Sequence, residues 1–310
     1  MSEHCVGAIS YAAGAMWPYR FVTSLYDRML ADHDEIFSIE TGTLVEDIEV
    51  NKDGSHYPYV LKTQHGSITA SHVVHATDGF AANLIPGLEG KVFPVRGHMT
   101  AQKPGTSFPN YNGSQSWSFI HRDDYDYVTQ RPGRGDTLDG KGAEILIGGG
   151  MTHSPAHGID EFGIWHDDKT SFSISSYLSG ALGLMFNTKT WGHDRGEARI
   201  KALWSGCMGF TTDLLPLIGR LDPDLTRRKP PSPDALHNEW IVAGFGGEGM
   251  VHAWLSGVAL GLTIVGREEI DCKGKYWRPP GRVMDWFPDQ FHCSKERVVA
   301  SSLPEMATML

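Results

Sequence analysis

A glycine-rich decapeptide near the end of the chain has the spacing of a nucleotide-binding turn. It reads IVAGFGGEGM, and Gly244, Gly246 and Gly249 form the only G-x-G-x-x-G pattern in the sequence. A glycine-lined turn at a helix N-terminus exposes backbone N–H groups and the positive end of the helix dipole. The turn therefore predicts a site for an anion, either a phosphate or an electron-rich ring oxygen. A turn that serves packing alone is the alternative.

The position of the turn separates two kinds of nucleotide site. A dinucleotide-binding domain opens with such a turn and continues into a strand with an acidic residue about 20 positions on. Glu268 and Glu269 lie near that distance, but the segment after them is rich in Trp and Pro and lacks alternating strands and helices. We therefore expect the turn to close on a nucleotide that is bound elsewhere. An NAD-dependent dehydrogenase built on this turn is the lower-ranked alternative.

The elements around the turn follow from the periodicity of apolar residues. Pro18 begins a predicted helix whose apolar face is made of Phe21, Val22, Leu25, Tyr26 and Met29. Strand-type runs follow at 36–41 (IFSIET), 44–50, 59–64 and 67–77, and then at 93–102 (FPVRGHMTAQ). After the turn, the helix from Met250 carries Ala253, Gly257 and Gly261 at intervals of four. This spacing predicts a flat strip that packs closely against a neighbour.

The middle of the chain differs from the rest in composition, with more aromatic residues in its strand-type runs. Aromatic strand-type runs occur at SWSFIH (116–121), YDYVTQRP (125–132) and EILIGGG (144–150). They predict a mostly antiparallel sheet in a second domain, followed by a helix-rich stretch from about 169 to 188.

Composition and charge argue against several classes of partner and site. The 310 residues are 40% hydrophobic with a net charge of -10, so nucleic acid is not expected as a partner. The cysteines lack C-x-x-C or metal-type spacing, and they are Cys5, Cys207, Cys272 and Cys293. We therefore expect a reduced, cytoplasmic protein with no metal site. The sequence shows no signal peptide and no membrane-spanning segment, so a soluble protein without a membrane partner is expected.

Three segments in this order resemble the D-amino-acid-oxidase-like FAD-dependent oxidoreductases, the group that includes sarcosine and glycine oxidases. The segments are VVHATDGFAANLIPGLEGKVFPVRGHM, WSGCMGFTTDLLPLIG and EWIVAGFGGEGMVHAWLSGVALG. The WPYRFVTSLYDRML helix and the GGEGM variant most resemble uncharacterised fungal members. The resemblance runs from about residue 10 to about residue 300.

The resemblance implies an α/β (α+β) fold. An incomplete glutathione-reductase-like FAD-binding domain would be interleaved with a substrate domain built on a mixed or antiparallel sheet. The implied limits are 1–92 and 203–266 for the FAD-binding domain, 93–202 for the substrate domain and 267–310 for a tail that wraps the FAD-binding domain. The family's phosphate-binding fingerprint belongs to an N-terminal βαβ unit that this sequence lacks. The alternative that this difference implies is a truncated, non-catalytic fragment or a split partner of such an enzyme.

The resemblance also implies FAD as the cofactor and a set of positions that bind it. Val45 would lie under the adenine end, and the turn would meet the isoalloxazine ring. Cys207 resembles the cysteine that is covalently attached to flavin in monomeric sarcosine oxidases, and a buried structural thiol is the alternative. The full set is Val45, Ala76, Thr77, Gly79, Cys207, Met208, Gly244, Phe245, Gly247, Glu248, Gly249 and Met250.

In this family the flavin takes a hydride from the carbon that bears the nitrogen of an amine or amino acid, and the protein orients the substrate. Arg96 could hold a substrate carboxylate with its guanidinium, or it could form a structural ion pair. His98 could lie by the flavin, or it could be hydrogen-bonded in place. Trp117, Phe119, Tyr125 and Tyr127 could line a substrate pocket or belong to the core of the sheet.

Overall fold

In the computed structural model, the chain divides into two compact units, each described here by itself. One unit comprises Met1–Phe21 and Arg96–Cys207, and the other comprises Val22–Val95 and Met208–Leu310. The structure describes residues 2–51, 57–121, 124–133, 144–194, 198–229, 238–274 and 277–303. The chain passes between the units within one helix, α1 (Pro18–Asp32), and two strands, β5 (Val92–Gln102) and β9 (Ile200–Thr211).

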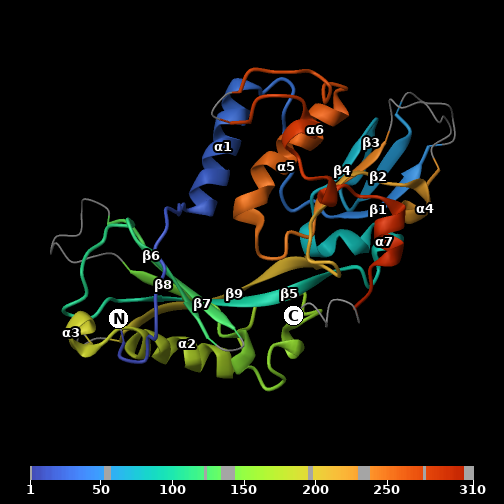
Figure 1. The fold of residues 1–310 in the computed structure, drawn as a ribbon. Helices are drawn as coiled ribbons and strands as arrows, with labels where there is room; N and C mark the ends of the chain where they lie inside the picture. Colours follow the sequence, from blue (N-terminus) through green and yellow to red (C-terminus); the bar gives the residue numbers. More distant parts are fainter. Residues whose placement is uncertain are drawn as a thin grey trace. The chain divides into compact units, whose positions relative to one another are not determined.

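The first unit is built on a five-stranded sheet with the order β6-β7-β8-β5-β9 (Figure 1). Its other strands are β6 (Ser116–Ile120), β7 (Tyr125–Gln130) and β8 (Ile145–Gly148). β6, β7, β8 and β5 pair in antiparallel fashion, which confirms the antiparallel sheet predicted from the aromatic runs.

One face of this sheet is covered by helix α2 (Phe172–Met185), which α3 (Thr188–Trp191) follows (Figure 1). Val128, Ile145 and Ile147 point to that face because side chains alternate along a strand. They pack against α2 residues such as Leu178 and Leu182, and all five side chains are at most 1% exposed. The short 3-10 turns of this unit are η3 (Met151–His153) and η4 (Ile159–Glu161).

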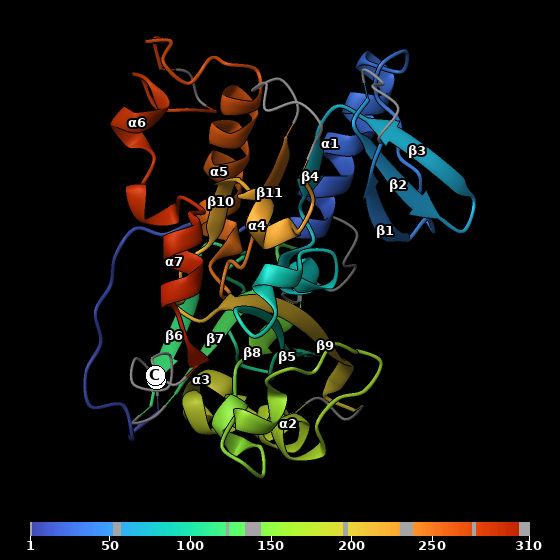
Figure 2. The ribbon, with the colours of Figure 1, turned by 90° about the vertical axis from the view of Figure 1, so that its right-hand side faces the viewer.

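The second unit contains two three-stranded sheets (Figure 2). The antiparallel one is formed by β1 (Val45–Val50), β2 (Tyr59–Thr63) and β3 (Gly66–Ala70). The mixed one has the order β10-β11-β4 and is formed by β10 (Leu217–Arg220), β11 (Glu239–Ala243) and β4 (Val73–His75). β11 runs parallel to β4 and antiparallel to β10. The chain thus has the predicted mixed α/β fold.

Both faces of the mixed sheet are buried. Ile241 and Leu217 face a cluster that includes residues of η1 (Asp78–Asn83), η2 (Pro86–Leu88), α4 (Pro223–Thr226) and α7 (Lys295–Ala300). Trp240 and Ile218 face the opposite cluster, which is formed with α5 (Gly249–Ile264), α6 (Val283–Trp286) and η5 (Asp289–Phe291) (Figure 2). Because side chains alternate along β10 and β11, helices pack on both faces of the sheet from which the glycine turn emerges.

Two sequence predictions are wrong. The run 36–41 is not a strand, because the N–H groups of Ile36 and Phe37 both donate to the carbonyl of His33 and extend the end of α1 as turns. The glycine strip of α5 is not packed against any described part of the chain, since a Cβ atom added at Gly257 or Gly261 would meet nothing there within 4 Å. The predicted helix at Pro18 is confirmed, although α1 has no buried residue.

Within the described residues, no helix is long and apolar enough to span a membrane.

Candidate functional site

The glycine turn connects β11 to α5 and depends on glycine for its backbone conformation. Gly244, Gly246 and Gly247 have φ angles of 77°, 58° and 86°, values that L-amino acids with a side chain rarely adopt. The chain therefore reverses within five residues after Ala243, and α5 begins at Gly249.

A carboxylate that sequence reasoning missed holds this turn in place. Asp78 Oδ1 accepts hydrogen bonds from the N–H groups of Gly244 at 2.8 Å and Phe245 at 3.2 Å. Its Oδ2 accepts from the N–H of Gly209 in β9 at 2.6 Å. The N–H of Gly246 in turn donates to the carbonyl of Gly209 at 2.7 Å. Asp78 thus joins the turn to β9, and its own φ of 45° is unusual for a residue with a side chain.

The surrounding glycines leave room for this carboxylate. A Cβ atom added at Gly209 would lie 2.5 Å from Asp78 Cγ and 2.3 Å from the nitrogen of Gly79. A Cβ atom added at Gly79 would lie 3.0 Å from the Cα of Pro94. Close contact between backbone segments is therefore what requires glycine at these positions.

Sequence could have pointed to Asp78. It follows β4 directly, and β4 runs parallel to β11. The carboxyl ends of parallel strands meet at one edge of a sheet, so an acidic residue after β4 lies near the amides that follow β11.

The start of α5 offers two further amides. Val251 N–H donates to the carbonyl of Glu248 at 3.0 Å, but in the described part of the chain the N–H groups of Gly249 and Met250 have no acceptor. A Cβ atom at Gly249 would meet only the side chain of Phe245, 3.7 Å away, and one at Gly247 would meet only Met208 Sδ at 3.7 Å. These amides and this space suit the electron-rich edge of a ring. The amides of Gly244 and Phe245 do not serve a phosphate, because Asp78 occupies them.

Three other predicted cofactor-binding positions lie on β1 and on the segment after β4. Val45 begins β1 and packs on the small cluster of Ile48, Tyr59 and Val73. Ala76 and Thr77 are exposed between β4 and η1.

Cys207 is half-buried in the first unit. Its thiol donates to the carbonyl of Ile164 with a sulfur–oxygen distance of 3.5 Å. Burial, together with the charge of Asp167, raises the pKa of this thiol, although Arg96 opposes the shift. The thiolate, which is the nucleophilic form, is thereby disfavoured.

Arg96 and His98 lie near each other on β5 with different partners. Arg96 Nε donates to Glu161 Oε2 at 2.7 Å, its Nη1 donates to the carbonyl of Lys169 at 3.1 Å, and the two charged side chains are 11% and 2% exposed. His98 is buried, and its Nε2 accepts from the N–H of Ser171, the N-cap of α2, at 2.8 Å. Burial lowers the pKa of His98, which favours the neutral ring. Glu161 was not singled out in the sequence.

The sheet separates the four predicted pocket aromatics. Trp117 and Phe119 pack against Phe186 on the face covered by α2, with ring centroids 5.4 and 5.6 Å from it. Tyr125 and Tyr127 alternate with the buried Asp126 and Val128, so they lie on the opposite face, where they are 52% and 40% exposed. The two pairs are therefore not brought together.

The family model described as FAD dependent oxidoreductase matches residues 2–261. The chain belongs to the FAD dependent oxidoreductase family. A search of curated proteins gave no match. Closeness to uncharacterised fungal members remains a prediction.

Several solved oxidase structures are similar to this chain. NikD, an unusual amino acid oxidase essential for nikkomycin biosynthesis, is 14% identical with a TM-score of 0.52, over 84% of this chain and 59% of NikD. Glycine oxidase from Geobacillus kaustophilus is 21% identical with a TM-score of 0.46, over 74% of this chain and 50% of that one. The fructosyl amine: oxygen oxidoreductase Amadoriase I from Aspergillus fumigatus is 12% identical with a TM-score of 0.49, over 82% and 49%. The chain spans about half the length of the glycine oxidases that it matches, 50% in each case.

Proposed function

We propose that this chain is an FAD-dependent oxidoreductase that oxidises a C–N bond of an amine or amino acid. The observation that supports the proposal is the pair of amides of Gly249 and Met250 at the positive end of α5, in a chain that matches the family model. The relation to NikD, an amino acid oxidase, agrees with this substrate class.

When bound, FAD supplies the redox chemistry by accepting a hydride from the carbon that bears the nitrogen. The contribution of this chain is position and charge. The N–H groups of Gly249 and Met250, with the dipole of α5, would stabilise negative charge at the edge of the ring if FAD were bound there. Asp78 fixes the turn so that these amides keep their direction. Val45, Ala76, Thr77, Gly79, Met208 and Glu248 stay proposed neighbours of the cofactor.

We assign no side chain as a general base. For Arg96 we favour the structural ion pair over the substrate clamp, because its guanidinium is already bonded to Glu161 and Lys169. For Cys207 we favour the structural thiol, because burial opposes thiolate formation. Tyr125 and Tyr127 remain proposed pocket residues, since they lie on the exposed face of the sheet.

The test is the colour of the purified protein. We expect flavin absorption after incubation with FAD and removal of the excess, bleached without oxygen by an amine or amino acid. Acid precipitation should release the colour into the supernatant, and colour that stays with the precipitate would show a covalent link at Cys207 instead. A cooperatively folded protein that retains no FAD would contradict the proposal.

A second candidate function, that of a split partner, is favoured by the open edge of β4. Among the described strands, β4 is the edge of the mixed sheet. Edge strands offer a row of backbone donors and acceptors to another strand. Mixing the chain with a βαβ unit from a family member should then restore FAD retention. The same unit with its fingerprint glycines replaced by valine is the control, because it keeps the strand and loses the phosphate turn.

The NAD-dependent alternative receives no such support. In the described segments after α5, at 265–274 and 277–303, the chain forms no strand that could continue a dinucleotide-binding domain. NAD should therefore neither bind to the protein nor protect it.

A further inference from the structure

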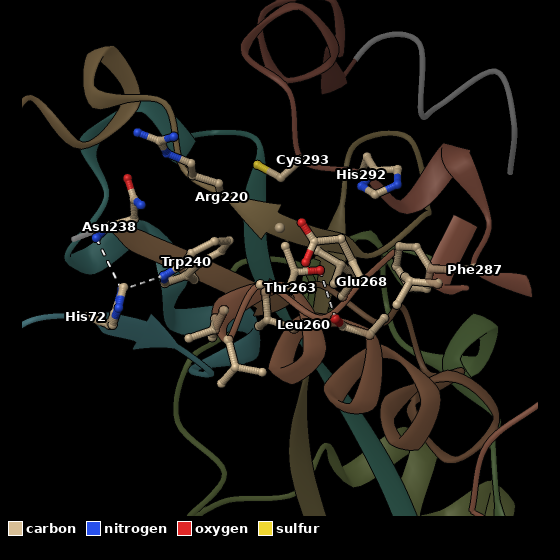
Figure 3. A pocket seen from close by; sticks show the side chains of 17 residues that line it. His72, Arg220, Asn238, Trp240, Leu260, Thr263, Glu268, Phe287, His292 and Cys293 are labelled. Atoms are coloured by element: carbon tan, nitrogen blue, oxygen red, sulfur yellow. Dashed lines mark hydrogen bonds between the residues drawn. The ribbon is translucent and has the colours of Figure 1, made fainter. Parts of the chain in front are cut away.

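A cavity lies in the second unit at the C-terminal end of α5, whereas the glycine turn lies at its N-terminal end. Figure 3 shows the side chains that line the cavity. It encloses about 830 Å³, within the range of small-molecule pockets. Its walls come from β10, β11, the last turns of α5 and the segment from α6 to Cys293. Since α5 runs from Gly249 to Ile264, its two ends are about 22 Å apart at 1.5 Å per residue. The cavity is thus separate from the proposed flavin site.

A buried carboxylate oxygen in this cavity has no partner. Glu268 lines the cavity, and its Oε2 is buried without a hydrogen bond in the described part of the protein. Thr263, the nearest hydroxyl side chain on α5, donates to the carbonyl of Ala259 at 2.9 Å and so does not serve the carboxylate (Figure 3). A buried carboxylate oxygen without a hydrogen bond is costly, and a cation beside it would offset that cost.

The end of α5 adds to this preference. Ile264, Val265 and Gly266 line the cavity, so the negative end of the helix dipole lies at its wall. Helix C-termini favour cations for this reason. The positive side chain that also lines the cavity, Arg220, is exposed to solvent, where its charge is screened.

The remaining walls are aromatic and apolar. Trp240 is 5% exposed, and its Nε1 donates to His72 Nδ1 at 3.2 Å, which fixes the orientation of the indole (Figure 3). Phe287, Ile218 and Leu260 are each at most 5% exposed and complete the apolar lining. Aromatic faces attract cations, and apolar walls suit a hydrocarbon body. A bare metal ion fits poorly, because the described residues contain no group of three metal-binding side chains.

We propose that this cavity binds a small organic cation, a primary ammonium carried on an aromatic body, with Glu268 as its counter-ion. The aromatic body lies between Trp240 and the apolar wall, and the ammonium group lies beside Glu268 and the end of α5. The site does not depend on flavin chemistry.

Calorimetric titration of the full chain with phenethylammonium tests the proposal. We expect 2-phenylethanol, the neutral analogue, to bind at least about tenfold more weakly, because it lacks the charge. Glu268→Gln should weaken phenethylammonium binding by about tenfold or more. Glu269→Gln is the matched control: the neighbouring carboxylate is exposed and faces Arg282 at 3.5 Å, so its loss should leave binding unchanged.

Thermal unfolding gives a second measurement that separates binding from folding. Glu268→Gln should raise the melting temperature of the free protein, because it removes the charge beside the unpartnered buried oxygen, and should abolish the further rise caused by phenethylammonium. Equal binding of the alcohol and the ammonium, unchanged binding in Glu268→Gln, or no binding to the unmodified protein would each overturn the proposal.

Discussion

At the scale of single residues, Asp78 combines three hydrogen bonds with a strained backbone. Its carboxylate accepts from Gly209, Gly244 and Phe245, and these bonds are charge-assisted. Its φ of 45° costs free energy that glycine would not incur. Hydrogen bonding and strain therefore act in opposite directions at one position, and two substitutions can separate them.

Asp78→Ala should lower the free energy of unfolding by about 2 kcal/mol, because it loses the charge-assisted bonds and keeps the strained φ. Asp78→Gly loses the same bonds but relieves the strain, so it should be about 1 kcal/mol more stable than Asp78→Ala. Urea unfolding measures both differences. Asp34→Ala, at an exposed aspartate, is the control. An alanine variant as stable as the unmodified protein would show that the clamp is dispensable.

Cysteine reactivity gives another prediction at this scale. Burial raises the pKa of Cys293 to about 12, whereas Cys5 is exposed. The thiolate is the reactive form, so at pH 8 only on the order of one in ten thousand Cys293 thiols is reactive. Iodoacetamide should label Cys5 in the folded protein and leave Cys293 nearly unlabelled, as measured by mass spectrometry of the peptides. Equal labelling of both in the folded protein would contradict the assigned burial.

At the scale of elements, a buried ionic network ties β11 to β4. Glu239 at the start of β11 accepts from His75 Nε2 at 2.9 Å and from Arg228 Nε and Nη2 at 2.8 and 2.7 Å. Burial alone would raise the pKa of Glu239, but the bonds from Arg228 and His75 outweigh it and lower the pKa. A lowered pKa means that the stabilisation is complete above the unfolded pKa of about 4.3 and is lost as pH falls through the folded pKa.

Glu239→Gln should therefore destabilise the protein by about 3 kcal/mol at pH 7, because Arg228 is left buried beside a neutral amide. The difference from the unmodified protein should begin to shrink as the pH falls below about 4, where the carboxylate is protonated in the unfolded chain, and should vanish below the lowered folded pKa. Urea midpoints between pH 7 and pH 3 test this. Glu49→Gln provides the comparison, since that side chain is 56% exposed and bonded to a single lysine, and it should change stability little. A Glu239→Gln difference that stays constant with pH would refute the assignment.

The glycine strip of α5 gives the second prediction for an element. Because added Cβ atoms at Gly257 and Gly261 would meet nothing, each Gly→Ala substitution should stabilise the protein by up to about 1 kcal/mol through helix propensity. Gly87→Ala should instead destabilise it, since its Cβ would lie 2.7 Å from the Cα of Leu225. Thermal melting of the three variants decides. If the Gly257 and Gly261 variants lose FAD or a βαβ partner while gaining stability, the strip is an interface after all.

At the scale of the whole molecule, the periodicity of apolar residues predicted an element correctly where one face of the segment is buried and the other is not. The alternating runs of β5, β7 and β8 each bury one set of side chains, and the helix after the glycine turn has the expected start. The run 36–41 is also rich in apolar residues, but the amides of Ile36 and Phe37 bond back to His33, and among the described residues no strand pairs with it. A segment with high strand propensity does not form a strand unless another strand pairs with it.

The candidate site was predictable only in part, for a related reason. The glycine spacing located the turn, because glycine reports a backbone conformation directly. The clamp by Asp78 and the pairing of Arg96 with Glu161 join residues that are distant in sequence. The four predicted pocket aromatics are divided between the two faces of the sheet by the register of β6 and β7. The alternation within Tyr125–Gln130 alone does not predict this register.

The bonds of Asp78 also bear on how a cofactor would enter. The carboxylate is covalently part of the chain, so the turn after β11 has its negative partner before any ligand arrives. FAD would then bind to amide groups whose orientation is already fixed, and little ordering of the loop would accompany binding. Calorimetry of FAD association should give a heat capacity change that reflects the contact surface alone, and Asp78→Ala should make that change more negative, because the turn would then fold as the ligand binds.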